Sequence, residues 1–178
     1  MPGRPAEDLT TVNTVLGAVC VVRGPSGQRE VPIDEFLTGP YETSLAFNEM
    51  LVEVRIPLRH RTSSAYAKVE RRVGDWAVAA AGAAVTLDNG SIAAARVGLT
   101  AVNADADRLA AVSEALVGQT PTDEVLAEAG RRAAAACEPV TDMRGSADYK
   151  RHLASELTIR TLRTAIQRVR EAPEPQGN

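Results

Sequence analysis

The sequence predicts an α+β fold in which an antiparallel sheet packs against helices gathered on one side. Strand-type patterns dominate the chain up to residue 102, and apolar residues at helical spacing dominate from residue 107 onward. Aromatic residues make up only 3% of the 178 positions. The core therefore has to be built from Ala, Val, Leu and Ile.

The N-terminal third is predicted to be rich in strands. Residues 15–23 form a short apolar run rich in Val, residues 24–27 (GPSG) interrupt it, and a strand pattern resumes at residues 29–33. This arrangement is typical of a β-hairpin. Residues 33–37 then predict a single helical turn.

A further strand and a boundary follow. Residues 49–57 (EMLVEVRIP) alternate in polarity and predict a strand with Val52, Val54 and Ile56 on one face. The next stretch, residues 58–64, is polar and basic. It predicts a boundary between two structural units.

Three more strands are predicted after this boundary. Residues 64–72 alternate and form a strand with one polar face, and residues 73–75 form a turn. Residues 78–87 are rich in alanine, which favours a helix by propensity. However, the Asp-Asn-Gly sequence at 88–90 is a strong hairpin signal. We therefore interpret residues 78–87 and 92–102 as paired strands.

The remainder of the chain is predicted to be helical. Residues 107–116 carry apolar side chains at helical spacing. Thr122 is a favourable N-cap for a helix over residues 123–137, and Ser146 for a long helix that ends near residue 170. A disordered tail is expected at residues 173–178.

Composition excludes several classes of protein. The net charge of −3 argues against nucleic acid or an anionic membrane as the main partner. No run of about 18 apolar residues occurs, so no transmembrane helix is expected. The first residues lack the apolar core of a signal peptide. Cys20 and Cys137 have no metal-ligand spacing and are expected to be buried thiols in the cytoplasm.

Few motifs carry chemistry by themselves. The sequence contains no phosphate-binding Walker loop and no glycine motif for dinucleotides, and no metal site or catalytic residue is assigned. Trp76 follows a charged run in a predicted turn, where a flat aromatic ring can stack on a planar ligand. Trp76 could instead be an ordinary packing residue. Lys68, on the strand before the turn, could be an ordinary solvated lysine rather than a ligand-binding residue.

Four segments in sequence order are more specific than any single motif. They read GPYETSLAFNEMLVEVRIP, AYAKVERRVGDWAVAAAGAAV, AARVGLTAVNADADRLAAVSEALVG and SADYKRHLASELTIRTLRTAI. Together they resemble the FAD-binding medium subunit of the molybdenum hydroxylases, a family that includes carbon monoxide dehydrogenase and xanthine dehydrogenase. The resemblance extends from about residue 5 to residue 169.

The resemblance implies a domain organisation and partners. Residues 1–58 correspond to the end of a flavin-binding domain, and residues 62–172 to a C-terminal domain with a three-stranded antiparallel sheet packed on helices. In this family a large subunit holds the molybdenum cofactor, and a small subunit carries iron–sulfur clusters. Electrons pass from these clusters to FAD and then to an acceptor. The two subunits are therefore the implied partners.

The resemblance also implies four FAD-binding residues. Asp8 matches an aspartate near the flavin, Leu51 a position lining the ring, and Lys68 a lysine at the FAD site. Trp76 stands where carbon monoxide dehydrogenase-like members carry a tyrosine against the ring. The alternatives are a solvated carboxylate for Asp8 and ordinary strand packing for Leu51.

The family's FAD-binding half also carries two glycine-rich segments, similar to AGGQSL and TIGG, that cradle the diphosphate. Neither occurs in this sequence. The expected cofactor is therefore FAD in an incomplete site, and binding by this chain alone is not expected. The chain is then a fragment, one part of a split subunit whose glycine-rich loops lie on a separate chain, or a degenerate module.

Two functions follow from these alternatives. The first is a partial or truncated flavin subunit that relays electrons from iron–sulfur clusters through FAD. The second is a non-catalytic α+β interaction module of such a complex that does not bind FAD. If the chain is a fragment or one part of a split subunit, the apolar face left by the missing half is expected to be an interaction surface.

Overall fold

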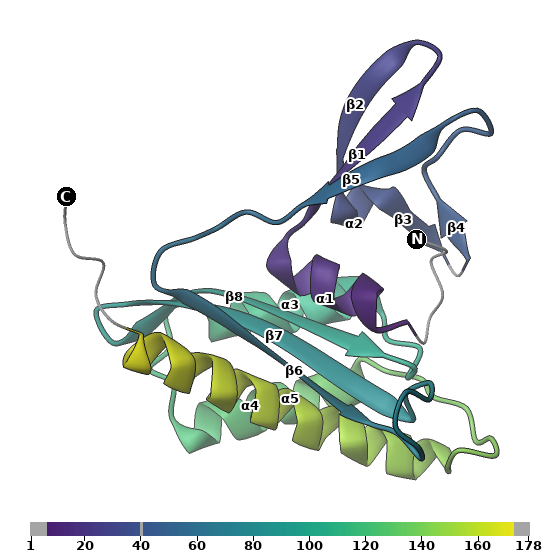
Figure 1. Ribbon diagram of the computed structural model, residues 1–178. Helices are drawn as coiled ribbons and strands as arrows, with labels where there is room; N and C mark the ends of the chain where they lie inside the picture. The colour runs from purple at the N-terminus through teal and green to yellow at the C-terminus, as the bar shows by residue number, and fades with distance from the viewer. Residues whose placement is uncertain (1–6, 40, 173–178) are drawn as a thin grey trace.

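The computed structural model describes residues 7–39 and 41–172 and shows antiparallel sheets with helices packed between and beside them (Figure 1). The elements in chain order are α1 (Asp8–Leu16), β1 (Val19–Gly24), β2 (Gly27–Pro32), α2 (Ile33–Phe36), β3 (Leu37–Gly39), β4 (Glu42–Thr43), β5 (Met50–Arg55), β6 (Thr62–Val69), β7 (Ala79–Asp88), β8 (Ser91–Thr100), α3 (Ala106–Leu116), α4 (Asp123–Ala135) and α5 (Ala147–Glu171). This is the mixed α and β architecture that the sequence predicts.

The larger sheet has the strand order β6-β7-β8 and is antiparallel throughout. Asn89 and Gly90 join β7 to β8 with φ angles of 47° and 81°. Both angles lie in the left-handed region that a two-residue hairpin turn requires. The hairpin prediction is therefore confirmed against the helix propensity of the alanines. Burial on both faces of the central strand outweighs that propensity.

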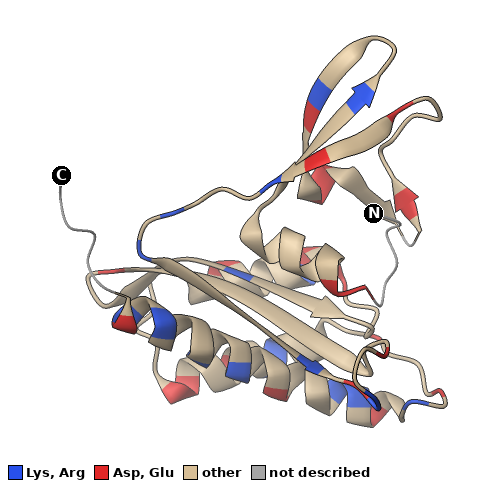
Figure 2. Cartoon of the chain, viewed as in Figure 1, with Lys and Arg blue, Asp and Glu red and all other residues tan. Residues whose placement is uncertain are grey.

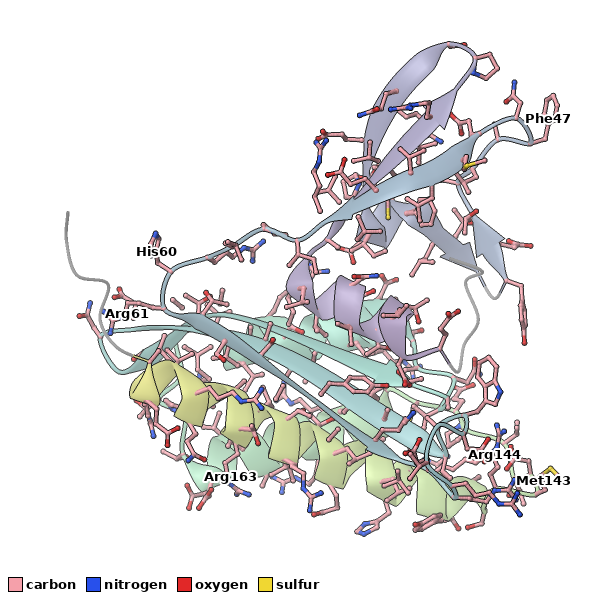
Figure 3. The ribbon with its side chains drawn as sticks, in the orientation of Figure 1. Phe47, His60, Arg61, Met143, Arg144 and Arg163 are labelled. Atoms are coloured by element: carbon pink, nitrogen blue, oxygen red, sulfur yellow. The ribbon has the colours of Figure 1, made fainter. Side chains whose placement is uncertain are left out.

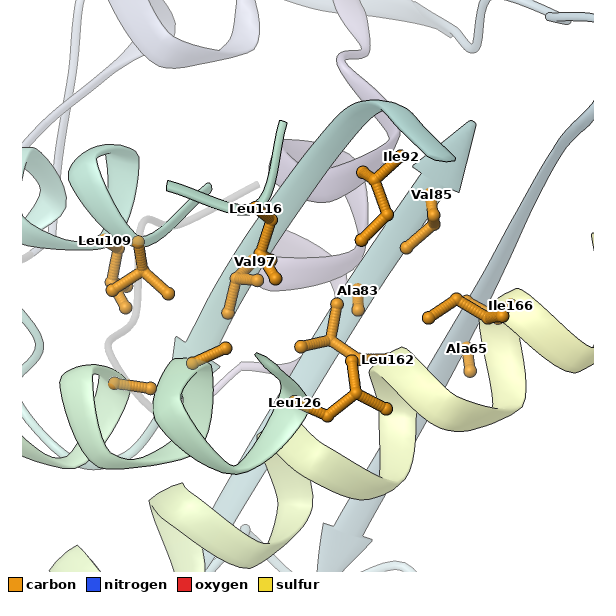
Figure 4. Packing of buried hydrophobic residues seen from close by; sticks show 14 of the residues in the cluster. Ala65, Ala83, Val85, Ile92, Val97, Leu109, Leu116, Leu126, Leu162 and Ile166 are labelled. Atoms are coloured by element: carbon orange, nitrogen blue, oxygen red, sulfur yellow. The ribbon is translucent and has the colours of Figure 1, made fainter. Parts of the chain in front are cut away.

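Helices α5 and α4 cover one face of this sheet, with α5 directly against β6 and β7 and α3 beside β8 (Figure 1). Small side chains on the strands allow the helices to approach closely. Figure 4 shows Ala83 and Val85 of β7 opposite Leu162 and Ile166 of α5. All four are buried, and full burial of a Leu or Ile contributes about 2 kcal/mol.

Helix α1 packs on the opposite face of the same sheet. Gly82 and Gly98 are paired across β7 and β8, and Thr11 and Val15 of α1 rest on them. A Cβ atom at Gly98 would lie 3.0 Å from side-chain carbons of both α1 residues. The Thr11 hydroxyl is also 2.6 Å from that of Thr100. These glycines therefore create the space that seats α1.

The second three-stranded sheet has shorter strands in the order β2-β1-β5; we call it the smaller sheet, and α2 closes its buried side. Strands β3 and β4 form a separate two-stranded sheet. Its core contains Val22 and Phe36, with Leu51 and Val54 packed against it. The predicted hairpin and the single helical turn are confirmed. The predicted faces of β5 are wrong, because a β-bulge opposite Val21 and Val22 shifts the register. Leu51 and Val54 face the core, whereas Val52 is exposed.

Helix starts are mostly as predicted. The hydroxyls of Thr122 and Ser146 accept hydrogen bonds from backbone amides in the first turns of α4 and α5. The predicted strand at residues 15–23 is partly wrong, because β1 begins at Val19 and Val15 belongs to α1. Gly17, with φ of 64°, ends that helix. Residues 173–178, predicted to be disordered, lie outside the described residues.

Both cysteines are buried, as predicted, and neither is in a disulfide. Burial raises the pKa of each thiol. No helix within residues 7–39 and 41–172 is long and apolar enough to cross a membrane.

Candidate functional site

Lys68 lies near the end of β6, on the face of the sheet that carries α1. Its ammonium nitrogen is 2.9 Å from a carboxylate oxygen of Asp8 and 2.9 Å from one of Glu70. It also donates a hydrogen bond of 3.3 Å to the backbone carbonyl of Asp75. Hydrogen bonds to Glu70 and then to Asp8 raise the pKa of Lys68. The amine is therefore held charged and in a fixed position.

Asp8 is the first residue of α1, where the partial positive charge of the helix dipole favours a carboxylate. Its second oxygen accepts a hydrogen bond of 2.8 Å from the Tyr66 hydroxyl. Burial raises the pKa of Tyr66, so the hydroxyl stays protonated and remains a donor. Asp8, Tyr66 and Lys68 thus connect α1 to β6 through one carboxylate.

The loop after β6 is organised by Asp75. Its carboxylate accepts a hydrogen bond of 2.7 Å from the backbone amide of Trp76. Two guanidinium groups flank it, Arg144 at 3.5 Å and Arg71 at 3.7 Å. Figure 3 shows Arg144 in the loop that precedes α5. Trp76 is 39% exposed and lies beside the Lys68 cluster.

The structure therefore brings together three of the four residues predicted to bind FAD, and it places the fourth elsewhere. Asp8 contacts Lys68 directly. The backbone carbonyl of Asp75 accepts a hydrogen bond from Lys68, and Trp76 is the next residue in the chain. Leu51 lies on β5, partly buried against the core of the smaller sheet. The FAD-binding role of all four residues stays a prediction.

Sequence reasoning missed other members of this cluster. Tyr66 and Glu70 alternate with Lys68 in the sequence, Tyr66 on β6 and Glu70 directly after its end, and that alternation is a signal that could have found them. Asp75 adjoins a predicted residue. Arg144 is 69 positions from Asp75, and only the fold reveals their contact. No group of three or more potential metal ligands occurs among the described residues.

Two family profiles match adjoining parts of the chain. Residues 1–59 match the FAD binding domain in molybdopterin dehydrogenase. Residues 64–165 match the CO dehydrogenase flavoprotein C-terminal domain. A helix-covered antiparallel sheet preceded by part of an FAD-binding domain defines a class, the flavoproteins of molybdopterin-dependent oxidoreductases.

Curated relatives agree with this class. The chain is 36% identical over 167 residues to the carbon monoxide dehydrogenase medium chain of Hydrogenophaga pseudoflava. It is 30% identical over 171 residues to the alpha subunit of the 6-hydroxypseudooxynicotine dehydrogenase complex of Paenarthrobacter nicotinovorans. These matches cover 93% and 95% of this chain but 58% of each relative. The chain thus spans less than two thirds of the length of these relatives.

Solved structures give the same result. The carbon monoxide dehydrogenase of Hydrogenophaga pseudoflava matches with a TM-score of 0.85 and 36% identity, over 94% of this chain and 58% of that one. Quinoline 2-oxidoreductase from Pseudomonas putida 86 matches with a TM-score of 0.81 and 30% identity, over 94% and 59%. The chain belongs to the CO dehydrogenase flavoprotein family, the FAD-containing medium subunits of molybdenum hydroxylases.

The described residues fit one part of FAD. A half-exposed indole beside a fixed lysine suits one side of a planar, polar ring. The described residues offer no comparable site for the diphosphate of FAD. Gly82 and Gly98 are covered by side chains of α1, and the sequence contains neither glycine-rich segment that the family uses for phosphates. The FAD site of this chain is therefore incomplete.

Proposed function

We propose that this chain forms part of the flavin subunit of a molybdenum hydroxylase and serves the relay of electrons from iron–sulfur clusters through FAD to an acceptor. One observation carries the proposal. The Asp8–Lys68 contact joins the segment that matches an FAD-binding domain to the segment that matches the flavoprotein C-terminal domain. The half-exposed Trp76 lies directly beside that junction.

The residues of this chain would orient the cofactor rather than react. FAD, when bound, supplies the exchange of electrons between donor and acceptor. Trp76 would offer a flat surface to the flavin ring, and Asp75 fixes its backbone. Lys68 is held by two carboxylates, so it would present a charge of fixed position near the ring. Such fixed charge tunes the electronics of a bound cofactor.

The proposal extends to partners and domains. The partners would be a large subunit with the molybdenum cofactor, a small subunit with iron–sulfur clusters, and a separate chain that carries the glycine-rich FAD loops. The domain boundaries would be residues 1–58 and 62–172, as the sequence predicts. The complex would lie in the cytoplasm.

The test is reconstitution. The chain is co-expressed with the part of the Hydrogenophaga pseudoflava medium chain that it does not match, and FAD is added to the purified pair. We expect flavin absorption near roughly 450 nm to remain after gel filtration. We also expect Trp76 fluorescence to fall when FAD binds, with Trp76→Phe as the control that reports emission from the partner segment.

The opposite result would favour the second function. A pair that assembles but stays colourless with added FAD would indicate a non-catalytic interaction module. Retained flavin with unchanged Trp76 fluorescence would support FAD binding and contradict the role of Trp76.

A further inference from the structure

The two edges of the smaller sheet differ in chemistry. Among the described residues, β2 and β5 each pair only with β1, so each leaves one edge without a partner strand. The β2 edge carries exposed polar residues and ends in Pro32, features that protect an edge from pairing with another chain. β5 carries exposed Met50 and Val52, and Phe47 and Ile56 flank it. Figure 3 shows Phe47 projecting outward from the loop before β5.

The charges along β5 are already neutralised within the sheet. Glu49, directly before β5, is 2.7 Å from the guanidinium of Arg29 on β2. Arg55 contacts Glu53 at 2.9 Å and also pairs with Glu30. Figure 2 shows these positive and negative segments side by side across the small sheet. The charged side chains on and beside β5 are therefore all paired within the sheet, and the exposed side chains that remain there are apolar, so the complement of this edge is a neutral, apolar strand.

The family comparison indicates where such a strand lies. The small sheet belongs to residues 1–59, which match an FAD-binding domain, and this chain covers 58% of its relatives. We propose that the β5 edge pairs with a neutral, apolar strand of a chain that carries the glycine-rich part of the FAD-binding domain. This inference rests on the proposed function, because it names the surface at which the second half of the flavin site docks.

Strand addition would also place that half beside Leu51, the predicted FAD-binding residue that lies apart from the Lys68 cluster. Backbone hydrogen bonds to an unpaired edge provide affinity, and the exposed side chains beside it provide specificity. Leu51, which the resemblance places at the flavin ring, lies on β5 itself. A strand added to β5 would therefore lie next to a predicted FAD-binding residue. The β2 edge, on the far side of β1, offers no such proximity.

The experiment compares the two edges. The unmatched part of the Hydrogenophaga pseudoflava medium chain is tagged and co-expressed with this chain, so that both halves fold together. Val52→Lys places a charge on the β5 edge, and Gln28→Lys places the same charge on the β2 edge. We expect wild type and Gln28→Lys to be captured equally, and Val52→Lys about tenfold less. Thermal melts of the two isolated variants check that each stays folded.

Hydrogen exchange locates the contact. In the captured pair, amides of β5 should become protected while those of β2 exchange as in the free chain. The proposal is overturned by failure of capture, by equal capture of Val52→Lys, or by protection of β2 instead. It is also overturned if the free chain forms a dimer that Val52→Lys dissociates, because β5 would then bind a second copy.

The same samples separate the two proposals. Capture that depends on Val52 in a pair that binds no FAD would support docking and contradict the flavin function. If the pair binds FAD and Val52→Lys is captured as well as wild type, the result would support the flavin function and contradict docking at β5.

Discussion

Lys150, near the start of α5, is only 3% exposed, yet nothing in the sequence marks it as buried. Its ammonium group donates a hydrogen bond of 2.9 Å to the backbone carbonyl of Val140 and lies 2.8 Å from the Asp142 carboxylate. Both partners belong to the loop before α5, which also carries Arg144. Arg144 in turn contacts Asp75, the residue before Trp76. Lys150 therefore fixes the loop that contacts Asp75.

We therefore expect Lys150→Met to lower the free energy of unfolding by about 1–2 kcal/mol, because Asp142 and the Val140 carbonyl lose a charged donor. Urea unfolding at pH 7 measures this change. Arg163→Gln is the matched control on the same helix. Its ion pair with Asp123 is exposed at both ends, so the change should stay within about 0.5 kcal/mol.

The effect of Lys150→Met should depend on pH. Hydrogen bonds from Lys150 and then from the Arg144 amide lower the pKa of Asp142 below its ordinary value of 3.8. A lowered pKa in the folded state gives stability that is complete above the ordinary value and is lost as pH falls through the lowered one. The difference between wild type and Lys150→Met should thus shrink below about pH 4. A difference that stays constant would contradict the ion pair.

The candidate site could be predicted at this scale only in part. Asp8 and Lys68 were found through the family resemblance, and the structure shows that they contact each other. Tyr66, which donates to the same Asp8 carboxylate as Lys68, can be predicted because it lies on the same strand face as Lys68. Arg144 cannot, because its contact with Asp75 depends on how the loop before α5 folds back toward β6.

Among the elements, the β7–β8 hairpin and helix α1 show what local sequence can and cannot specify. The hairpin is predictable because Asn89 and Gly90 adopt positive φ at little cost, which few residue pairs do. Helix α1 is not predictable from an apolar stripe, since Thr11 and Asn13 are among its buried residues. Its position is set by the small residues of a sheet that lies far along the chain.

We expect Gly98→Ala to destabilise the protein by about 1–3 kcal/mol, because the new methyl group would meet Thr11 and Val15 of α1 at 3.0 Å. Thermal or urea unfolding measures this loss. Ala94→Val is the control, since Ala94 lies exposed on the same strand and should change stability by at most about 0.5 kcal/mol. Equal effects of the two substitutions would show that α1 is not seated on Gly98.

For the whole molecule, the polar stretch at residues 58–64 predicts a boundary, and the connection between β5 and β6 is an exposed segment there. Contacts nevertheless cross this boundary at several points. Helix α1 packs on β7 and β8, and Arg96 of β8 lies 2.6 Å from Asp34 of α2. These contacts join residues far apart in sequence, so the packing of the two units could not be predicted from local pattern.

A protease site inserted between Pro57 and Arg61 tests whether these contacts hold the molecule together. After cleavage, we expect the two pieces to elute as one species on gel filtration, because the buried Thr11–Thr100 contact and the packing of Val15 on Gly82 and Gly98 stay in place. Combining Gly98→Val with Asp34→Ala removes the space for α1 and the ion pair of Arg96, so the cleaved double variant should separate into two peaks. Separation of the cleaved wild type would instead show that the peptide linker, rather than α1, maintains the arrangement that brings Asp8 to Lys68.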